Sequence, residues 1–196
     1  MKTRSKPDLV PTPSQTVGPY FSLCLEGPCS IRTMAPADVQ GERVKLRCVV
    51  FDRAGRPVSD TLIEIWQANA HGKYNHPADR QTKPIDRRFL GFGRQVTDEN
   101  GVCEFDTIKP GRVPSRGHAL QAPHLEVAVF TRGILKPLIT RIYFSGEGSN
   151  DACPVLALVP KARRRTLMAE PVVGQPGSWR HEIRLSGAKE TVFFDV

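Results

Sequence analysis

The sequence predicts an all-β protein, an antiparallel β-sandwich, and three observations lead to this prediction. Seventeen prolines and sixteen glycines divide the 196 residues into short pieces, which argues against long helices. Several of these pieces alternate apolar and polar residues, as a strand with one buried face does. Turn signals recur roughly every 8–12 residues, a spacing that is typical of sandwiches.

The alternation also gives the order of the elements. Val44, Leu46, Cys48 and Val50 alternate with charged residues and predict a strand over 44–50. Further strands are expected over 61–67, 94–97, 102–108, 124–131, 138–144, 181–185 and 190–195. Residues 1–20 should form an extended Pro-rich arm, 69–88 an irregular loop, and part of 151–168 a short helical segment, limited by its prolines.

Composition places the chain among ordinary globular proteins, with 39% hydrophobic and 24% charged residues. We expect one domain over 1–196, made of the arm (1–20) and a sandwich core (40–196). No apolar run approaches the roughly 18 residues of a membrane helix, and no secretory signal is visible, so we expect a cytoplasmic protein. The five cysteines form no C-x-x-C pair and should be reduced structural thiols rather than disulfides or a zinc site.

The net charge of +8 raises nucleic acid as a partner. The only dense basic run is 161–165, and neither a recognition helix nor an aromatic-interleaved basic strand accompanies it. We therefore interpret the charge as a solvated basic face or a contact for an acidic partner, one that would also draw small anionic substrates. Neither nucleic acid nor a membrane is an expected partner.

Four segments carry a resemblance to a known family. They are Thr12-Pro-Ser-Gln-Thr-Val-Gly-Pro-Tyr20, Glu64-Ile-Trp-Gln-Ala-Asn-Ala-His-Gly-Lys-Tyr74, Gly93–Gly101 with Thr107-Ile-Lys-Pro-Gly111, and Leu138-Ile-Thr-Arg-Ile-Tyr-Phe144. In this order, and over nearly the whole chain, they resemble the intradiol ring-cleaving dioxygenases. The resemblance implies a β-sandwich and non-haem iron(III) chemistry.

In that family, two tyrosines and two histidines hold the iron, the histidines in a His-x-His strand. By the resemblance, the tyrosine positions fall here at Gln81 and Val113, and the His-x-His strand reads His124-Leu-Glu126. These four would be vestigial metal positions, because neither valine nor glutamine can replace a phenolate ligand. His124 and Glu126 share a strand face and could serve as two ligands of a facial triad, but the other histidines lie in unrelated loop or tail contexts. We expect this chain to bind no metal, to hold no catalytic residue, and to pair His124 with Glu126.

Because it lacks these ligands, the chain resembles the α-type subunit of the family, which pairs with an iron-bearing β subunit in a hetero-oligomer. The implied cofactor is Fe(III), held by that partner. The implied reaction opens protocatechuate between its two hydroxylated carbons with O2 to give 3-carboxy-cis,cis-muconate.

The same resemblance implies that one group of residues walls the substrate pocket beside the partner's iron. These residues are Thr16, Gly18, Pro19, Tyr20 and Arg132. The planar guanidinium of Arg132 suits a carboxylate, such as that of protocatechuate. Two other possibilities remain open, namely that the arm only packs on the partner and that Arg132 pairs with a nearby acid such as Glu126. Trp66 and Phe130 should belong to the core or an interface.

Two rival functions also remain. One is a single-chain intradiol enzyme with a rearranged iron site, which would contain iron and turn over substrate alone. The other is a non-enzymatic β-sandwich binding module, similar to transthyretin-like carriers or carbohydrate-binding domains, which would need no partner.

Overall fold

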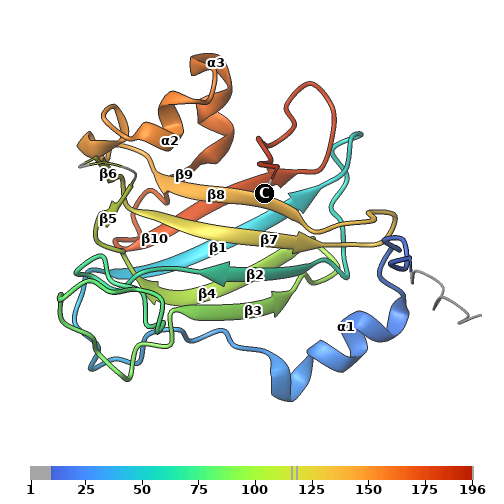
Figure 1. Ribbon diagram of the computed structural model, residues 1–196. Coiled ribbons are helices and arrows are strands. Elements are labelled where there is room, and N and C mark those ends of the chain that lie inside the picture. Colours follow the sequence, from blue (N-terminus) through green and yellow to red (C-terminus); the bar gives the residue numbers. More distant parts are fainter. Residues whose placement is uncertain (1–9, 116, 118, 196) are drawn as a thin grey trace, which may run out of the picture.

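Eight strands form one large sheet whose two halves face each other (Figure 1). The structure is a computed structural model, and it describes residues 10–115, 117 and 119–195. The strands of this sheet are β1 (Arg43–Phe51), β2 (Leu62–Trp66), β3 (Phe92–Val96), β4 (Val102–Ile108), β7 (His124–Phe130), β8 (Leu138–Phe144), β9 (Met168–Pro171) and β10 (Ser178–Arg184). A two-stranded sheet consists of β5 (Val113–Pro114) and β6 (Leu120–Gln121). The helices are α1 (Pro19–Leu25), α2 (Pro154–Ala157) and α3 (Lys161–Arg164), with 3-10 turns η1 (Gly27–Cys29), η2 (Gly148–Asn150) and η3 (Arg165–Leu167).

The strand order is β3-β2-β7-β8-β9-β10-β1-β4. The predicted all-β sandwich is confirmed, but its strands are not all antiparallel, since β8 pairs parallel with β9 and β1 pairs parallel with β10. Parallel neighbours need a long crossover connection. The short helices between β8 and β9 supply one, and β9 links the two halves of the sheet by pairing with β8 on one side and β10 on the other.

The core lies between the two halves and follows the alternation of the sequence. The inward residues of β1 are buried, namely Val44, Leu46, Cys48 and Val50, while Lys45 and Arg47 are exposed. The opposite half contributes the buried residues Leu125, Val127 and Val129 of β7. Burying an aliphatic side chain of this size stabilises the fold by about 1.5–3 kcal/mol, so the interdigitated faces hold the halves together. All five cysteines have free thiols.

A short segment before β1 closes the gap between the outermost strands. Ile31 exchanges two backbone hydrogen bonds with Arg94 of β3, at 2.8 and 2.9 Å, and Met34 donates to Asp106 of β4 at 2.9 Å. Met34 is fully buried, and a Cβ added to Gly93 would lie 2.8 Å from its sulfur. Only glycine therefore leaves room for this closing residue.

Two expectations about elements are wrong. Residues 190–195 form no strand, because side chains take the backbone groups of Val192: its carbonyl accepts from Thr140 and its N–H donates to Thr166. The tail meets β8 only at a single bridge between Phe194 and Ile139. Residues 1–9 of the predicted arm lie outside the described residues, and the rest does not stay extended through residue 20, because α1 begins at Pro19, a residue suited to the first turn of a helix. The expected helical segment in 151–168 is confirmed as α2, α3 and η3.

Within the described residues, every helix falls short of the length and apolarity that a membrane span requires.

Candidate functional site

Strand β7 connects two groups of predicted site residues. His124 is its first residue and Arg132 lies two residues beyond its last, so we call these regions the His124 end and the Arg132 end of β7. At about 3.3 Å per residue, a seven-residue strand separates them by roughly 20 Å. In Figure 1, the first end lies beside β5 and β6, and the second lies toward α1.

The His124 end holds a buried polar network. His124 is 3% exposed, and its Nδ1 donates to the carbonyl of Ala122 at 2.7 Å. Its Nε2 lies 3.4 Å from Oε1 of Glu126, as expected for a pair, although the geometry does not complete a hydrogen bond and leaves Nε2 buried without one. The same Oε1 lies 2.6 Å from the guanidinium of Arg141. Glu126 therefore has a cation of its own chain as its closest partner.

Arg141 reaches this position because of the register between β7 and β8. Glu126 and Arg141 are direct cross-strand partners, and such pairs place their side chains on one face. Arg141 also donates to Gln121 at 2.6 Å and approaches the hydroxyl of Tyr143 at 3.4 Å. The guanidinium is thus held from three sides.

The electrostatics agree with an ion pair. Burial opposes the ionisation of Glu126 most strongly, but contact with His124 and the charge of Arg141 outweigh it and lower the pKa of this carboxyl. Burial also opposes the charge of Arg141, yet Glu126 raises the pKa of the guanidinium above its usual value. Burial, and after it the charge of Glu126, raises the pKa of Tyr74 to about 12.

The two other vestigial positions line a neighbouring hollow of about 420 Å³. Val113 is buried in β5 and offers only hydrocarbon. Gln81 uses its side-chain amide on Gly72 and Asp79, both at 3.0 Å. The structure therefore brings Gln81 and Val113 to one hollow, with neither of them presenting a free anionic donor.

Aromatic side chains form the wall of this hollow. Trp66 lies nearly parallel to Tyr74, with ring centroids 5.9 Å apart, and His76 meets Trp66 edge-on. Trp66 is half-buried here.

The donor set at the His124 end does not fit iron(III). Of the four vestigial positions, only His124 has a free donor atom, its Nε2; Glu126 is neutralised by Arg141, Gln81 is engaged, and Val113 has no donor. A hard, highly charged ion needs several anionic oxygen ligands. In the described part of the chain, no group of three or more His, Cys, Asp or Glu residues could hold a metal ion. His118 lies outside the described residues.

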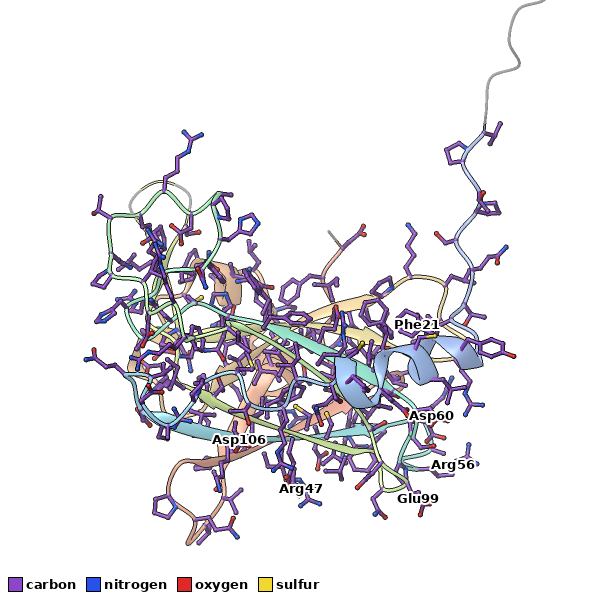
Figure 2. All side chains as sticks on the ribbon, turned by 90° about the horizontal axis from the view of Figure 1, so that it is seen from below. Phe21, Arg47, Arg56, Asp60, Glu99 and Asp106 are labelled. Atoms are coloured by element: carbon purple, nitrogen blue, oxygen red, sulfur yellow. The ribbon has the colours of Figure 1, made fainter. Side chains whose placement is uncertain are left out.

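The Arg132 end brings the arm to the sandwich. The hydroxyl of Thr16 accepts a hydrogen bond from the backbone of Gly133 at 2.8 Å, and Phe21 of α1 packs on Phe130 with ring centroids 5.4 Å apart. Gly18 accepts from the backbone of Phe21 at 3.0 Å, which forms the first turn of α1 with Pro19. Figure 2 shows Phe21 and Asp60 at this same end, with residues 10–18 of the arm leading away from α1.

The polar groups at this end stay accessible. Arg132 lies 3.4 Å from Asp60, and the two side chains are 68% and 55% exposed. The acid beside Arg132 is therefore Asp60, and Glu126, the expected alternative, belongs to Arg141 instead. Tyr20 is 78% exposed and contributes no core contact.

The sequence did not reveal Arg141, which is the centre of the buried network. Its strand, 138–144, was predicted with the correct bounds, but no local signal gives the β7–β8 register. The pairing of Arg132 with Asp60 was missed for the same reason, since the two lie 72 residues apart.

Comparisons with known proteins identify the class to which this fold belongs. The dioxygenase domain of a dioxygenase carbohydrate-binding protein fusion from Streptomyces sp. SirexAA-E superposes with a TM-score of 0.61 at 27% identity, covering 91% of this chain and 100% of that one. A family model described as "Dioxygenase" matches residues 17–185. The chain belongs to the intradiol dioxygenase family.

Curated relatives narrow the similarity to one type of subunit. The chain is 41% identical to a protocatechuate 3,4-dioxygenase alpha chain from Burkholderia cepacia, covering 94% of this chain and 97% of the relative. It is 38% identical to the alpha chain from Pseudomonas putida, covering 96% and 98%. The beta chain from Burkholderia cepacia is 39% identical over a shorter region, covering 66% of this chain and 56% of that protein.

Proposed function

We propose that this chain is the α subunit of a protocatechuate 3,4-dioxygenase. Together with an iron-bearing β subunit, it would open protocatechuate between its two hydroxylated carbons, inserting both atoms of O2 to give 3-carboxy-cis,cis-muconate. The observation that carries the proposal is the pairing of Glu126 with Arg141 at a position where an iron site would need an available ligand. The near full-length similarity to two alpha chains supports the same assignment.

In this proposal, the iron belongs to the β subunit. The vestigial positions offer one available nitrogen donor, Nε2 of His124, which favours a structural role for this region. The five free cysteines suit the reducing cytoplasm, where we place the assembly.

The Arg132 end would then serve the partner's active site. Its proposed pocket residues are Thr16, Gly18, Pro19, Tyr20 and Arg132. Exposed ion pairs are worth about 0–1 kcal/mol, so a substrate carboxylate could displace Asp60 from Arg132 at little cost. Thr16 and Phe21 fix the arm beside this cation, and the exposed ring of Tyr20 remains available to a partner.

The direct test is to produce the chain alone and together with a β subunit that carries the complete tyrosine and His-x-His ligand set. We expect the chain alone to be colourless and inactive, and the co-purified pair to bind iron and consume protocatechuate and O2. Turnover by the lone chain would favour the rearranged single-chain enzyme. A lone chain that forms no complex with the β subunit would favour the non-enzymatic binding module.

A further inference from the structure

A basic groove of about 420 Å³ lies on the outer face of β9 and β10, beneath α3 and η3. We use the name basic groove for the hollow lined by Ala162, Arg163, Arg165, Thr166, Met168, Glu170, Arg180, Glu182, Arg184, Ala188 and Lys189. It shares none of these residues with the hollow at the His124 end or with the predicted pocket residues at the Arg132 end. The sequence signal was the basic run 161–165, to which the proposed function gives no role.

The groove carries an excess of positive charge. Its lining has five cationic side chains and two carboxylates, which leaves three positive charges in excess. Glu182 is already occupied by Arg180 at 2.9 Å and Arg184 at 2.8 Å. Glu170 accepts a hydrogen bond from Ser145 at 2.7 Å. The carboxylates are therefore satisfied within the chain.

The remaining cations have no acidic partner among the residues that the structure describes. Across the described residues, no ion pair joins Arg163, Arg165 or Lys189 to a carboxylate. They approach the groove from two segments that are distant in sequence, Arg163 and Arg165 from α3 and η3 and Lys189 from the segment after β10. Cations that converge on one hollow raise the local positive potential more than the same charges spread over a surface.

Two arginines of the groove, Arg163 and Arg184, are held in place by contacts within the chain. Arg163 donates to the carbonyl of Glu190 at 3.0 Å, which ties α3 to the segment that bears Lys189. Arg184 lies over the ring of Phe51, 4.8 Å from its centroid, and also pairs with Glu182. Arginines that are already positioned lose less conformational freedom when they bind an anion.

We propose that the basic groove binds a small anion that carries several carboxylates. Guanidinium groups match carboxylates with paired hydrogen bonds, and the volume falls in the range of about 300–1,000 Å³ that small ligands occupy. No aromatic side chain lines the described groove, so it lacks the stacking surfaces by which proteins hold single-stranded nucleic acid. The ring-opened product carries three carboxylates and belongs to this class, and only this link to the product rests on the proposed function.

The test is titration calorimetry of citrate, a tricarboxylate probe, into the assembled enzyme at constant ionic strength, without protocatechuate. We expect one citrate site per copy of this chain, with acetate binding at least tenfold more weakly. Arg165→Ala should weaken citrate binding about tenfold, the size expected for one charge-assisted hydrogen bond. Arg87→Ala, which removes an exposed arginine outside the groove, should leave the affinity unchanged.

Three outcomes would overturn the proposal. Equal losses in Arg165→Ala and Arg87→Ala would mean that citrate follows only the overall positive charge. Inorganic phosphate binding as tightly as citrate would assign the groove to phosphate. If citrate does not bind, the basic groove would be assigned instead to an acidic surface of a partner protein. Because no turnover is measured, each of these failures leaves the proposed function standing.

Discussion

At the His124 end of β7 the charged groups are partly buried and tightly paired within the chain, whereas at the Arg132 end they are exposed and loosely paired. Arg141 is 17% exposed and lies 2.6 Å from Glu126, while Arg132 is 68% exposed and lies 3.4 Å from Asp60. Both are arginine–carboxylate pairs beside the same strand. The difference lies in what each arginine is free to do.

A buried pair with good geometry cannot release its arginine without leaving a charge unpaired, which costs about 3–5 kcal/mol. An exposed pair can exchange its carboxylate for another at little cost. One strand therefore has a closed end that stabilises the fold and an open end suited to a ligand or a partner. This contrast explains how a chain of an iron-dependent family could contribute to a site without holding the metal.

The largest expected effect is at the closed end. Arg141→Met should lower the free energy of unfolding by about 2–3 kcal/mol, because Glu126, which is 29% exposed, would remain partly buried without a counter-charge. Glu126→Gln combined with Arg141→Met should recover much of this loss. Urea denaturation measures both. The control is Arg180→Met, since its guanidinium is 51% exposed and should contribute at most about 1 kcal/mol. Similar losses at Arg141 and Arg180 would erase the distinction between closed and open pairs.

At the open end, the effect should appear in substrate choice. Arg132→Ala in the assembled enzyme should lower kcat/KM for protocatechuate roughly 10- to 100-fold, because a hydrogen bond between charged groups is worth about 1.5–3 kcal/mol. Catechol has no carboxylate and should be affected much less. Arg56→Ala, which removes another exposed arginine paired with an acid, is the matched control. Equal losses for both substrates would assign Arg132 to structure.

Acid should weaken the closed end selectively. The pKa of Glu126 is lower in the folded chain than its ordinary value of 4.5, so its ion pair contributes fully above pH 4.5. That contribution is lost as the pH falls through the lowered folded value. The stability difference between the wild type and Glu126→Gln should therefore be constant from pH 7 to about pH 5 and shrink below it. A difference that grows on acidification would show that Glu126 is not held as a carboxylate.

The smallest effect concerns the arm. Thr16→Val removes the acceptor for the backbone of Gly133 and should cost about 0.5–1.5 kcal/mol of arm docking. We expect a rise in KM for protocatechuate of up to about tenfold, with rescue by Thr16→Ser. Thr12→Val, at another exposed threonine of the arm, should have no effect. Equal responses at residues 12 and 16 would mean that this hydrogen bond does not hold the arm.

The local sequence pattern predicted the strands well where one face of the strand is buried and the other is exposed to solvent. The bounds of β4 and β8 agree with the prediction, β7 differs by one residue at its end, and β1 is one residue longer at each end. The pattern failed at residues 190–195, where alternation is present but the side chains of Thr140 and Thr166 take the backbone groups of Val192. Strand propensity cannot show which groups will bind the backbone.

The site was predictable only in part, for the same reason. That His124 and Glu126 share a face follows from the two-residue period of a strand. The partner of Glu126 does not, because it depends on which residue of β8 stands opposite. The long-range pairing that brings Arg132 to Asp60 and Thr16 to Gly133 is likewise a property of the folded chain.

The central claim, that this chain supports an iron site without holding the ion, is tested most directly by the iron content of the assembled enzyme with and without His124. Of the four vestigial positions, His124 has the donor nitrogen that is left free, so His124→Gln should leave the assembly with one iron per αβ pair, as in the wild type. A loss of iron in proportion to the substituted chain would contradict the account.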